Sequence, residues 1–438
     1  MNAAAPGPSV LEVRLARELE RLRGEDLYRV RRRVDGAHGV AITVEGRACV
    51  NFCSNDYLGL AADPRLAEAA RAALLRSGTG SGAAALISGY NVEHARLEEE
   101  LAAFVGRPRA LLFSTGWAAN LGVLRALFGK RDTLVCDELN HASLIDGARL
   151  SGAHYARVSH RDLAGFESAL GSGAARGGNL GLVSDSVFSM DGDLADLPAL
   201  AAMSRRHGAT LIIDDAHGFG VLGAHGRGAI EHYSERSSKS VPASLETGNW
   251  KLETAVPDIY VATLGKSLGA AGAFVAGSEA LIEYLIQRAR SWVFSTAPPP
   301  SIAAAARAAL AIIQSEPEHR RRLLSNIARF RSGAAQLGIP LSPSMTAIQP
   351  LVLGDAARAM ALSRQLFERG WWVAAIRPPT VPIGTSRLRI TLSAAHTTTQ
   401  IDGLLEAVAS CQLPVVREAA ADAETPGFSG NWKPATGN

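Results

Sequence analysis

The chain has few of the features that mark several common classes of protein. Its 438 residues include four cysteines, and these form neither a CxxC pair nor the spacing of metal ligands. We therefore predict reduced thiols, no metal site and a cytoplasmic location. An excess of one charge is also lacking, since 45 basic residues face 42 acidic ones. That balance gives no reason to expect nucleic acid as a partner.

Long apolar runs are missing as well. The stretch from Ser301 to Ile313 is too short to cross a bilayer and contains Arg307, so no membrane association is predicted. The segment from Met1 to Val10 lacks the basic and apolar regions of a secretory signal. With 47% hydrophobic and 20% charged residues, the composition is typical of a soluble folded enzyme rather than a disordered chain.

Between Asn55 and Trp292, short apolar runs alternate with amphipathic helical segments. The runs that predict strands are Leu111–Phe113, Thr133–Cys136, Leu180–Val183, Thr210–Ile213 and Ile259–Ala262. The helical segments include Glu93–Val105 and Asp196–His207. Such alternation predicts an α/β fold in which helices cover both faces of a mainly parallel sheet.

The chain length favours one large domain and a smaller one. Residues 1–54 are predicted as an N-terminal helix and strand segment, 55–295 as the large domain, 296–415 as a small α+β domain, and 416–438 as a disordered tail. The first boundary of the small domain follows the stiff sequence Ser295–Pro300. From Val10 to Arg33, leucines at helical spacing and eight arginines predict a solvated amphipathic helix.

Two polar groups follow predicted strands in a way that suggests covalent chemistry. Asp214 ends the apolar run Leu211–Ile213, and Lys266 stands between small residues just after Ile259–Ala262. Such a lysine can form an imine with an aldehyde, and an aspartate from a neighbouring strand can keep a pyridine nitrogen protonated. Pyridoxal 5'-phosphate (PLP) chemistry requires that pair. Asp215 should point elsewhere, because side chains alternate along a strand.

Other residues gain meaning from that pair. His217 could reach the hydroxyl of a cofactor ring, and His141 could stack on the ring or move protons, although single histidines of this kind are usually structural. Gly116 and Trp117 open a helix whose backbone N–H groups could bind a phosphate, or they form an ordinary strand-to-helix turn. Arg389 could grip a substrate carboxylate, or lie as a surface arginine on an edge strand.

A rival interpretation concerns the triplet Gly265-Lys266-Ser267, which invites comparison with a nucleotide-binding P-loop. That motif requires a glycine five positions before Gly265, where Tyr260 stands. The nucleotide-hydrolase interpretation is therefore excluded. Further on, Arg377–Pro382 is predicted to be a rigid extended segment that places Thr380 reproducibly.

Taken together, these segments resemble a known family. Ser54–Gly59, Phe188–Gly192, Asp214–Gly218, Thr263–Lys266 and Arg387–Ile390 are similar to motifs of the α-oxoamine synthases, in the same order. These are PLP-dependent transferases of fold type I, which implies a seven-stranded type of sheet and a homodimer. Ala375–Pro382 and Ala347–Pro350 further resemble the members that condense L-alanine with a pimeloyl thioester, carried by acyl carrier protein or CoA, in biotin biosynthesis.

The resemblance also implies roles for individual residues. The implied catalytic residues are Lys266, His141 and Asp214. The implied cofactor-binding residues are Gly116, Trp117, His141, Ser189, Asp214, His217, Thr263 and Lys266. The implied substrate-binding residues are Arg29 (placed on the N-terminal helix), Asn55, His141, Thr380 and Arg389.

The sequence departs from the family pattern in its interval between Asp214 and Lys266, which is longer than usual. We predict that the surplus, at about 234–256, is a surface loop. A sister enzyme that uses glycine is the alternative function. A catalytically silent scaffold subunit is a third hypothesis, and the presence of Lys266 counts against it.

Overall fold

The computed structural model describes residues 8–238 and 256–411 of the chain. Most of the segment predicted as a surface loop, 234–256, lies outside the described residues, and so does the whole predicted tail, 416–438. The domain boundaries stay predictions. The strands of this part of the chain form one large sheet and two small ones.

The large sheet has seven strands in the order β4-β10-β9-β8-β7-β5-β6. Its strands are β4 Arg109–Phe113, β5 Thr133–Asp137, β6 His154–Val158, β7 Leu180–Asp185, β8 Thr210–Asp214, β9 Ile259–Thr263 and β10 Ala273–Gly277. Strand β10 runs antiparallel to both of its neighbours, whereas the other pairs are parallel. The prediction of a mainly parallel sheet is thus confirmed.

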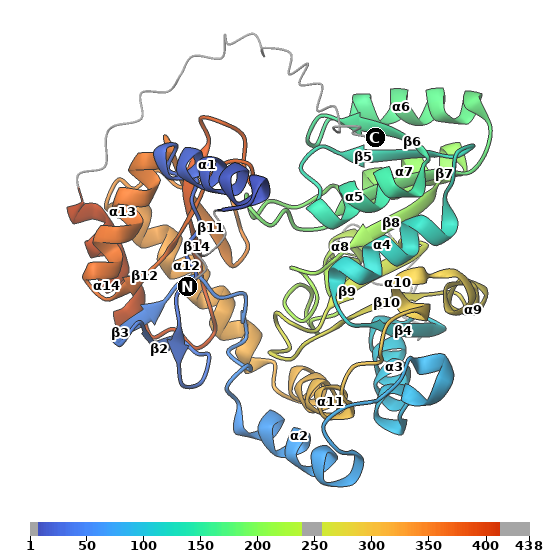
Figure 1. Cartoon of the computed structure of the whole chain (residues 1–438), viewed down its shortest axis with the longest axis horizontal. Helices are drawn as coiled ribbons and strands as arrows, with labels where there is room; N and C mark the ends of the chain where they lie inside the picture. The colour runs from blue at the N-terminus through green and yellow to red at the C-terminus, as the bar shows by residue number, and fades with distance from the viewer. Residues whose placement is uncertain (1–7, 239–255, 412–438) are drawn as a thin grey trace, which may run out of the picture.

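These strands are apolar on both faces because helices cover both. Along β8, Leu211 and Ile213 belong to one buried cluster and Ile212 to the cluster on the opposite face. The alternation of side chains along a strand produces this division. Helices α4 Gly116–Leu127, α5 Ala142–Ser151 and α9 Glu279–Arg288 cover one face, and α6 Leu163–Arg176 and α7 Leu197–His207 cover the other (Figure 1). The C-terminal ends of β7 and β8, which carry Asp185 and Asp214, are therefore held rigidly in place.

Further helices flank this sheet. They are α2 Pro64–Ser77, the π-helix Ala85–Gly89, α3 Val92–Val105, α8 Ala229–Ser238, α10 Arg290–Val293 and α11 Pro300–Ser315. The long helix α11, which follows the proline-rich sequence, packs against α2 and α3.

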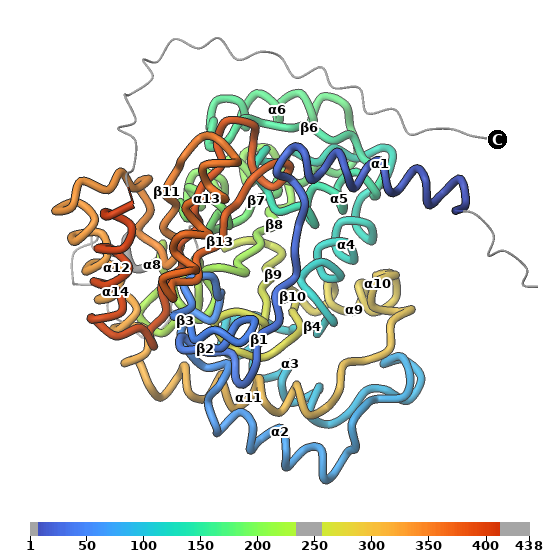
Figure 2. Tube along the Cα trace, turned by 60° about the vertical axis from the view of Figure 1, so that its left-hand side comes forward, coloured from blue at the N-terminus to red at the C-terminus, as the bar shows by residue number. Residues whose placement is uncertain are grey.

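The two ends of the chain fold together around the small sheets. A three-stranded antiparallel sheet has the order β11 Ile348–Gly354, β14 Ser386–Thr391 and β13 Ala374–Ile376. The other sheet joins β1 Val34–Asp35, β2 Ala41–Val44 and β3 Arg47–Asn51 to β12 Trp371–Trp372. Because β3 pairs in parallel with β12, the N-terminal strands lie beside the C-terminal segment (Figure 2). Helices α12 Glu318–Gln336, α13 Ala356–Glu368 and α14 Thr398–Ser410 complete this part.

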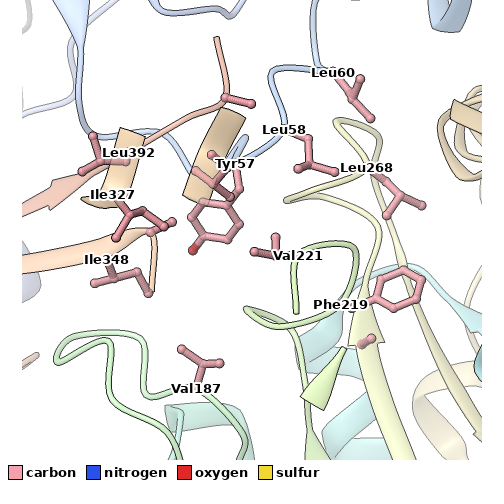
Figure 3. Packing of buried hydrophobic residues seen from close by; sticks show 14 of the residues in the cluster. Tyr57, Leu58, Leu60, Val187, Phe219, Val221, Leu268, Ile327, Ile348 and Leu392 are labelled. Atoms are coloured by element: carbon pink, nitrogen blue, oxygen red, sulfur yellow. The ribbon is translucent and has the colours of Figure 1, made fainter. Parts of the chain in front are cut away.

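One hydrophobic core is continuous between the large sheet and the C-terminal part. Figure 3 shows side chains from both of them, together with the loop after β3, converging in this core. Its members include Tyr57, Leu58, Leu60, Val187, Phe219, Val221, Leu268, Ile327, Ile348 and Leu392. Burial of apolar surface therefore fixes the C-terminal part against the end of the large sheet where the strand-end aspartates lie.

Two local predictions were wrong. The N-terminal helix, α1, spans Val10–Gly24 and does not continue to Arg33. It ends in a Schellman motif, with Leu27 N–H bonded to Leu22 O and Asp26 at φ 56°. Glycine usually takes that position, so the usual stop signal is missing from this stretch of sequence. Arg29 consequently lies after the helix rather than on it.

The segment Arg377–Pro382 turns instead of extending. The N–H of Thr380 donates to the carbonyl of Arg377 at 3.1 Å, which closes a turn. Prolines fix φ but leave the direction of the chain to the residues around them. Thr380 carries the first N–H after the two prolines, and that group makes the closing bond.

Among the residues described, no helix combines the length and the apolar character needed to span a membrane.

Candidate active site

Carboxylates gather where neighbouring parallel strands end. Asp185 closes β7, Asp214 closes β8, and the two are register partners across the sheet. Both are buried. Burial, followed by the proximity of Asp214, raises the pKa of Asp185 well above its usual range. Asp185 Oδ2 accepts the backbone N–H of His141 at 2.6 Å.

Asp214 and Asp215 point apart, as the alternation of side chains predicted. Asp214 Oδ2 accepts from Asn120 Nδ2 at 2.7 Å, and its Oδ1 accepts from the N–H of Ala216 at 2.9 Å. On the other side, Asp215 Oδ2 accepts from the Tyr260 hydroxyl at 2.7 Å. Burial raises the pKa of Asp215 to about 6. Asp214 thus belongs to the strand-end group, whereas Asp215 is structural.

Lys266 follows β9 and faces the same end of the sheet. Its Nζ lies 2.7 Å from His217 Nε2, and His217 Nδ1 lies 2.5 Å from the hydroxyl of Tyr57. Burial lowers the pKa of Lys266 to about 8, against the opposing charges of Asp214 and Asp185. Burial and the charge on Lys266 lower the pKa of His217 well below its usual range. A neutral His217 is therefore the partner of the lysine amine.

A hydrogen-bond chain links this lysine to an arginine of the C-terminal part. A neutral His217 that accepts from Lys266 at Nε2 carries its proton on Nδ1 and donates it to Tyr57. The Tyr57 hydroxyl then donates to Asn55 Oδ1 at 3.2 Å, and the same oxygen accepts from Arg389 Nη1 at 3.1 Å. One continuous polar path thus joins residues from four separate segments of the sequence.

Arg387 and Arg389 share one face of β14, but their surroundings differ. The buried side chain of Arg387 forms an ion pair with the partly exposed Asp191. Arg389 Nε donates instead to the carbonyl of Ser189 at 2.6 Å, and no carboxylate pairs with it among the described residues. The strand is central in its sheet and Arg389 is 6% exposed, so the alternative of a surface arginine on an edge strand is wrong. Arg389 is the arginine whose charge is left for an anionic ligand.

A helix N-terminus lies on the same side of the sheet. Thr115 Oγ1 caps α4 by accepting from Ala118 N–H at 3.0 Å. The N–H groups of Gly116 and Trp117 lie in its first turn and have no intrahelical acceptor. Trp117 meets the ring of His141 edge to face, with centroids 6.4 Å apart. These N–H groups and rings suit an anion and an aromatic ligand.

The remaining predicted residues fall into two places. Thr263, at the end of β9, donates through Oγ1 to Gly272 O at 3.0 Å and accepts from Gly265 N–H at 3.2 Å. Arg29 and Thr380 are exposed and contact each other, with 3.4 Å between Nη2 and Oγ1. No described contact joins that pair to the group around Lys266.

Sequence reasoning missed three residues of the site. The hydroxyl of Tyr57 links His217 to Asn55. Asn120 donates to Asp214, and Asp185 accepts the backbone N–H of His141. Asp185 ends an apolar strand just as Asp214 does, and that signal could have revealed it. Asn120 lies within a helix, where nothing in the sequence marks it out.

A partly buried lysine with a lowered pKa, a strand-end aspartate beside it and free N–H groups at a helix terminus define an enzyme that holds PLP. Comparison with known proteins agrees: residues 47–408 match the model for aminotransferase class I and II. The chain belongs to that family of PLP-dependent enzymes. The resemblance predicted from the sequence is confirmed.

Individual relatives are more specific. The chain is 53% identical over 394 residues to a protein of Methylococcus capsulatus named 8-amino-7-oxononanoate synthase, covering 90% of this chain and 97% of that one. Among solved structures, it is similar to serine palmitoyltransferase of Sphingomonas wittichii, with a TM-score of 0.81, 30% identity and coverage of 93% and 98%. It is also similar to 8-amino-7-oxononanoate synthase of Francisella tularensis, with a TM-score of 0.68, 32% identity and coverage of 83% and 97%.

Proposed function

We propose that this protein catalyses the 8-amino-7-oxononanoate synthase reaction of biotin biosynthesis. In that reaction L-alanine and a pimeloyl thioester give 8-amino-7-oxononanoate, CO2 and the free thiol carrier. The structural observation that carries the proposal is Arg389, a buried arginine without a carboxylate partner among the described residues, joined by a polar path to the amine of Lys266. The high identity to proteins named for this reaction supports it.

The proposed roles follow from the contacts. Arg389 binds the carboxylate of alanine, and Asn55 holds the guanidinium in place by accepting from Nη1. Lys266, whose pKa of about 8 leaves part of the amine neutral, takes the proton from the α-carbon and later returns one. PLP, when bound, supplies the electron sink that stabilises negative charge at that carbon.

Other side chains hold the cofactor and orient the proton transfers. Asp214, kept in place by Asn120, would hold the proton of the pyridine nitrogen when PLP is bound. His217 holds the lysine amine at 2.7 Å. The residues proposed to bind the cofactor are Gly116, Trp117, His141, Ser189, Asp214, His217, Thr263 and Lys266. Arg29 and Thr380, which contact each other, are proposed to bind the acyl substrate.

A homodimer is part of the proposal. Apolar side chains near the bridge between Ala84 and Thr296 are exposed, namely Leu86, Ile87 and Phe294 at 52%, 80% and 70%. A partner subunit that covers them would remove this apolar surface from water. Sedimentation of the holoenzyme tests the point, and a monomer at micromolar concentration would contradict it.

We propose acyl carrier protein as the acyl donor, with CoA as the alternative.

The decisive experiment supplies carboxyl-labelled L-alanine with pimeloyl thioesters of CoA and of acyl carrier protein to the PLP-loaded enzyme. Labelled CO2 and 8-amino-7-oxononanoate, identified by mass, are the expected products. A Lys266→Ala variant serves as the inactive control. Glycine is run in parallel, because an enzyme that turned over glycine faster than alanine would belong to the sister reaction. No CO2 with either donor at full cofactor content would refute the proposal.

A further inference from the structure

The loop Phe188–Asp193, which follows β7, determines where Arg389 sits. The loop is closed on itself by hydrogen bonds from Phe188 N–H to Asp193 O at 3.0 Å and from Gly192 N–H to Phe188 O at 2.8 Å. It carries the carbonyl that accepts from Arg389 Nε, at Ser189. A shift of this loop would therefore move the guanidinium group.

The loop is fixed on the side of the C-terminal part. Gly192 O accepts from Ser344 Oγ at 2.8 Å and from Thr346 Oγ1 at 2.9 Å. Gly192 has φ 72°, and a Cβ added there would come within 2.4 Å of Ile348 O. The loop is therefore packed too closely on this side to hold any residue but glycine at that position.

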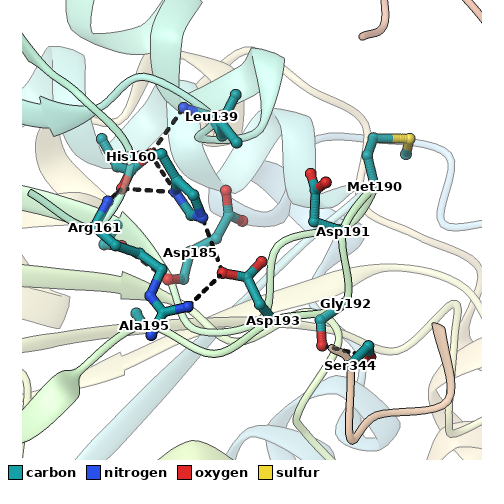
Figure 4. Close-up of polar contacts among 12 residues, drawn as sticks. Leu139, His160, Arg161, Asp185, Met190, Asp191, Gly192, Asp193, Ala195 and Ser344 are labelled. Carbon is teal, nitrogen blue, oxygen red and sulfur yellow. Dashed lines mark hydrogen bonds and ion pairs between the residues drawn. The ribbon is translucent and has the colours of Figure 1, made fainter. Parts of the chain in front are cut away.

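His160 fixes the other side of the loop, and this residue has no role in the function proposed above. It follows β6, and its Nδ1 lies 3.1 Å from each carboxylate oxygen of Asp137, the last residue of β5. Its Nε2 lies 2.9 Å from Asp193 Oδ2 (Figure 4). The ring also meets Phe188 edge to face, with centroids 4.3 Å apart. His160 thus joins the platform of the large sheet to the loop.

The geometry requires a charged imidazole. Both ring nitrogens face carboxylate oxygens, which only accept, so both must donate. Burial lowers the pKa of His160, but the hydrogen bonds to Asp137 and Asp193 outweigh it and raise the pKa to about 9. Asp193 depends on this contact: its Oδ1 has no partner among the described residues, and Oδ2 meets only His160 and, at 3.6 Å, Arg161.

We propose that His160 is a positioning residue for the grip on the amino-acid carboxylate, acting through Asp193 and Ser189 to orient Arg389. The inference rests on the proposed function, in which Arg389 binds that carboxylate. His160 contacts neither Lys266 nor Arg389 directly. Its loss should therefore weaken the binding of the amino acid and leave both the chemistry and the acyl substrate largely unaffected.

Two substitutions separate the halves of the bridge. His160→Asn places an amide N–H where Nδ1 stood, which retains the bond to Asp137 and loses the one to Asp193. His160→Gln places its amide near the position of Nε2 and retains the bond to Asp193. We expect H160N to raise the KM for L-alanine about tenfold, the size of one lost charge-assisted hydrogen bond. H160Q should recover most of that loss.

A binding measurement accompanies the kinetics. The dissociation constant of L-alanine, taken from the change in cofactor absorbance without any thioester, should rise by the same factor, whereas kcat and the KM for the thioester change by less than about twofold. The matched control is His207→Asn. His207 pairs with Glu167 at 2.8 Å, and its side chain is 19% exposed against 20% for His160. It does not contact the loop, so all of these constants should stay unchanged.

Three outcomes would overturn the inference: an alanine KM that does not change in folded, PLP-loaded H160N, an equal rise in the KM for both substrates, and H160Q no better than H160N. If H160N does not fold, as judged by thermal unfolding, Asp193→Asn tests the same link and should raise the alanine KM in the same way. Failure of the proposed function would show separately, as no CO2 from the unsubstituted enzyme. In that case the alanine titration still tests His160.

Discussion

The amine of Lys266 offers a quantitative test of the site, because its reactivity depends on how much of it is uncharged. Desolvation lowers its pKa to about 8, although Asp214 and Asp185 favour the charged form. At pH 7 about one amine in ten is then neutral, compared with about one in 2,500 for an ordinary lysine. Capture of an aldehyde by Lys266 should therefore be fast at neutral pH.

The perturbation is pH, applied to enzyme from which PLP has been removed. The rate of PLP capture should rise about tenfold between pH 6 and pH 7 and level off above pH 8, following the neutral fraction of the amine. Stopped-flow absorbance follows the reaction, and borohydride reduction with peptide mass mapping identifies the modified residue. Lys130→Ala is the matched control and should capture PLP as the unsubstituted enzyme does, whereas Lys266→Ala should give no adduct.

A rate that keeps rising tenfold per unit up to pH 10 would refute this reasoning, because it would mean that the surroundings of Lys266 leave its pKa in the ordinary range. Modification at a residue other than Lys266 would refute the site itself.

Three further predictions concern other groups. Asp214→Asn can still accept from Asn120, but it cannot hold the proton of the pyridine nitrogen, so kcat should fall on the order of a hundredfold; kcat within twofold of the parent would contradict this. Arg389→Lys should raise the KM for alanine about tenfold, since one ammonium group cannot replace the guanidinium bonds to Ser189 and Asn55 and also bind the carboxylate, and an unchanged KM in steady-state assays would exclude the carboxylate role. The folded-state pKa of His160 is about 9, above the usual 6.5, so its ion pairs stabilise the protein fully below pH 6.5 and lose that effect as the pH rises through 9. The melting temperature measured from pH 6.5 to 10 should fall more steeply for the parent than for His160→Gln, and parallel curves would argue against the charged bridge.

Sequence patterns predicted the large sheet where strands are rich in branched residues, and missed strands that are not. Strand β10 is made of Ala273, Phe274, Val275, Ala276 and Gly277, and its small residues lack a strong strand signature. Tertiary burial on both faces nevertheless makes it a strand. Strand β6 lies at the edge of the sheet, and four of its five residues are exposed or half-buried, so no apolar run marked it.

In the site, the sequence revealed the groups at strand ends and missed those whose partners come from elsewhere. Asp214 and Lys266 were identifiable because each follows an apolar run directly, and a buried strand delivers such a polar residue to the open end of the sheet. Tyr57 and Asn120 acquire their roles only when a loop and a helix are packed against the sheet. No local pattern encodes those contacts, and the functional roles assigned to individual residues stay predictions.

The pairing of β3 with β12 has a consequence for how the protein is made. Val50 leaves the ribosome early, whereas its partner Trp371 emerges near the end of translation. Until then one edge of β3 is unpaired in the nascent polypeptide, and Asn55 lacks the guanidinium of Arg389 that donates to it in the folded protein. A truncated product that stops before residue 371 would retain Lys266 and Asp214. It would lack Arg389, which is proposed to bind the substrate carboxylate, and it would lack β12, the strand that pairs with β3.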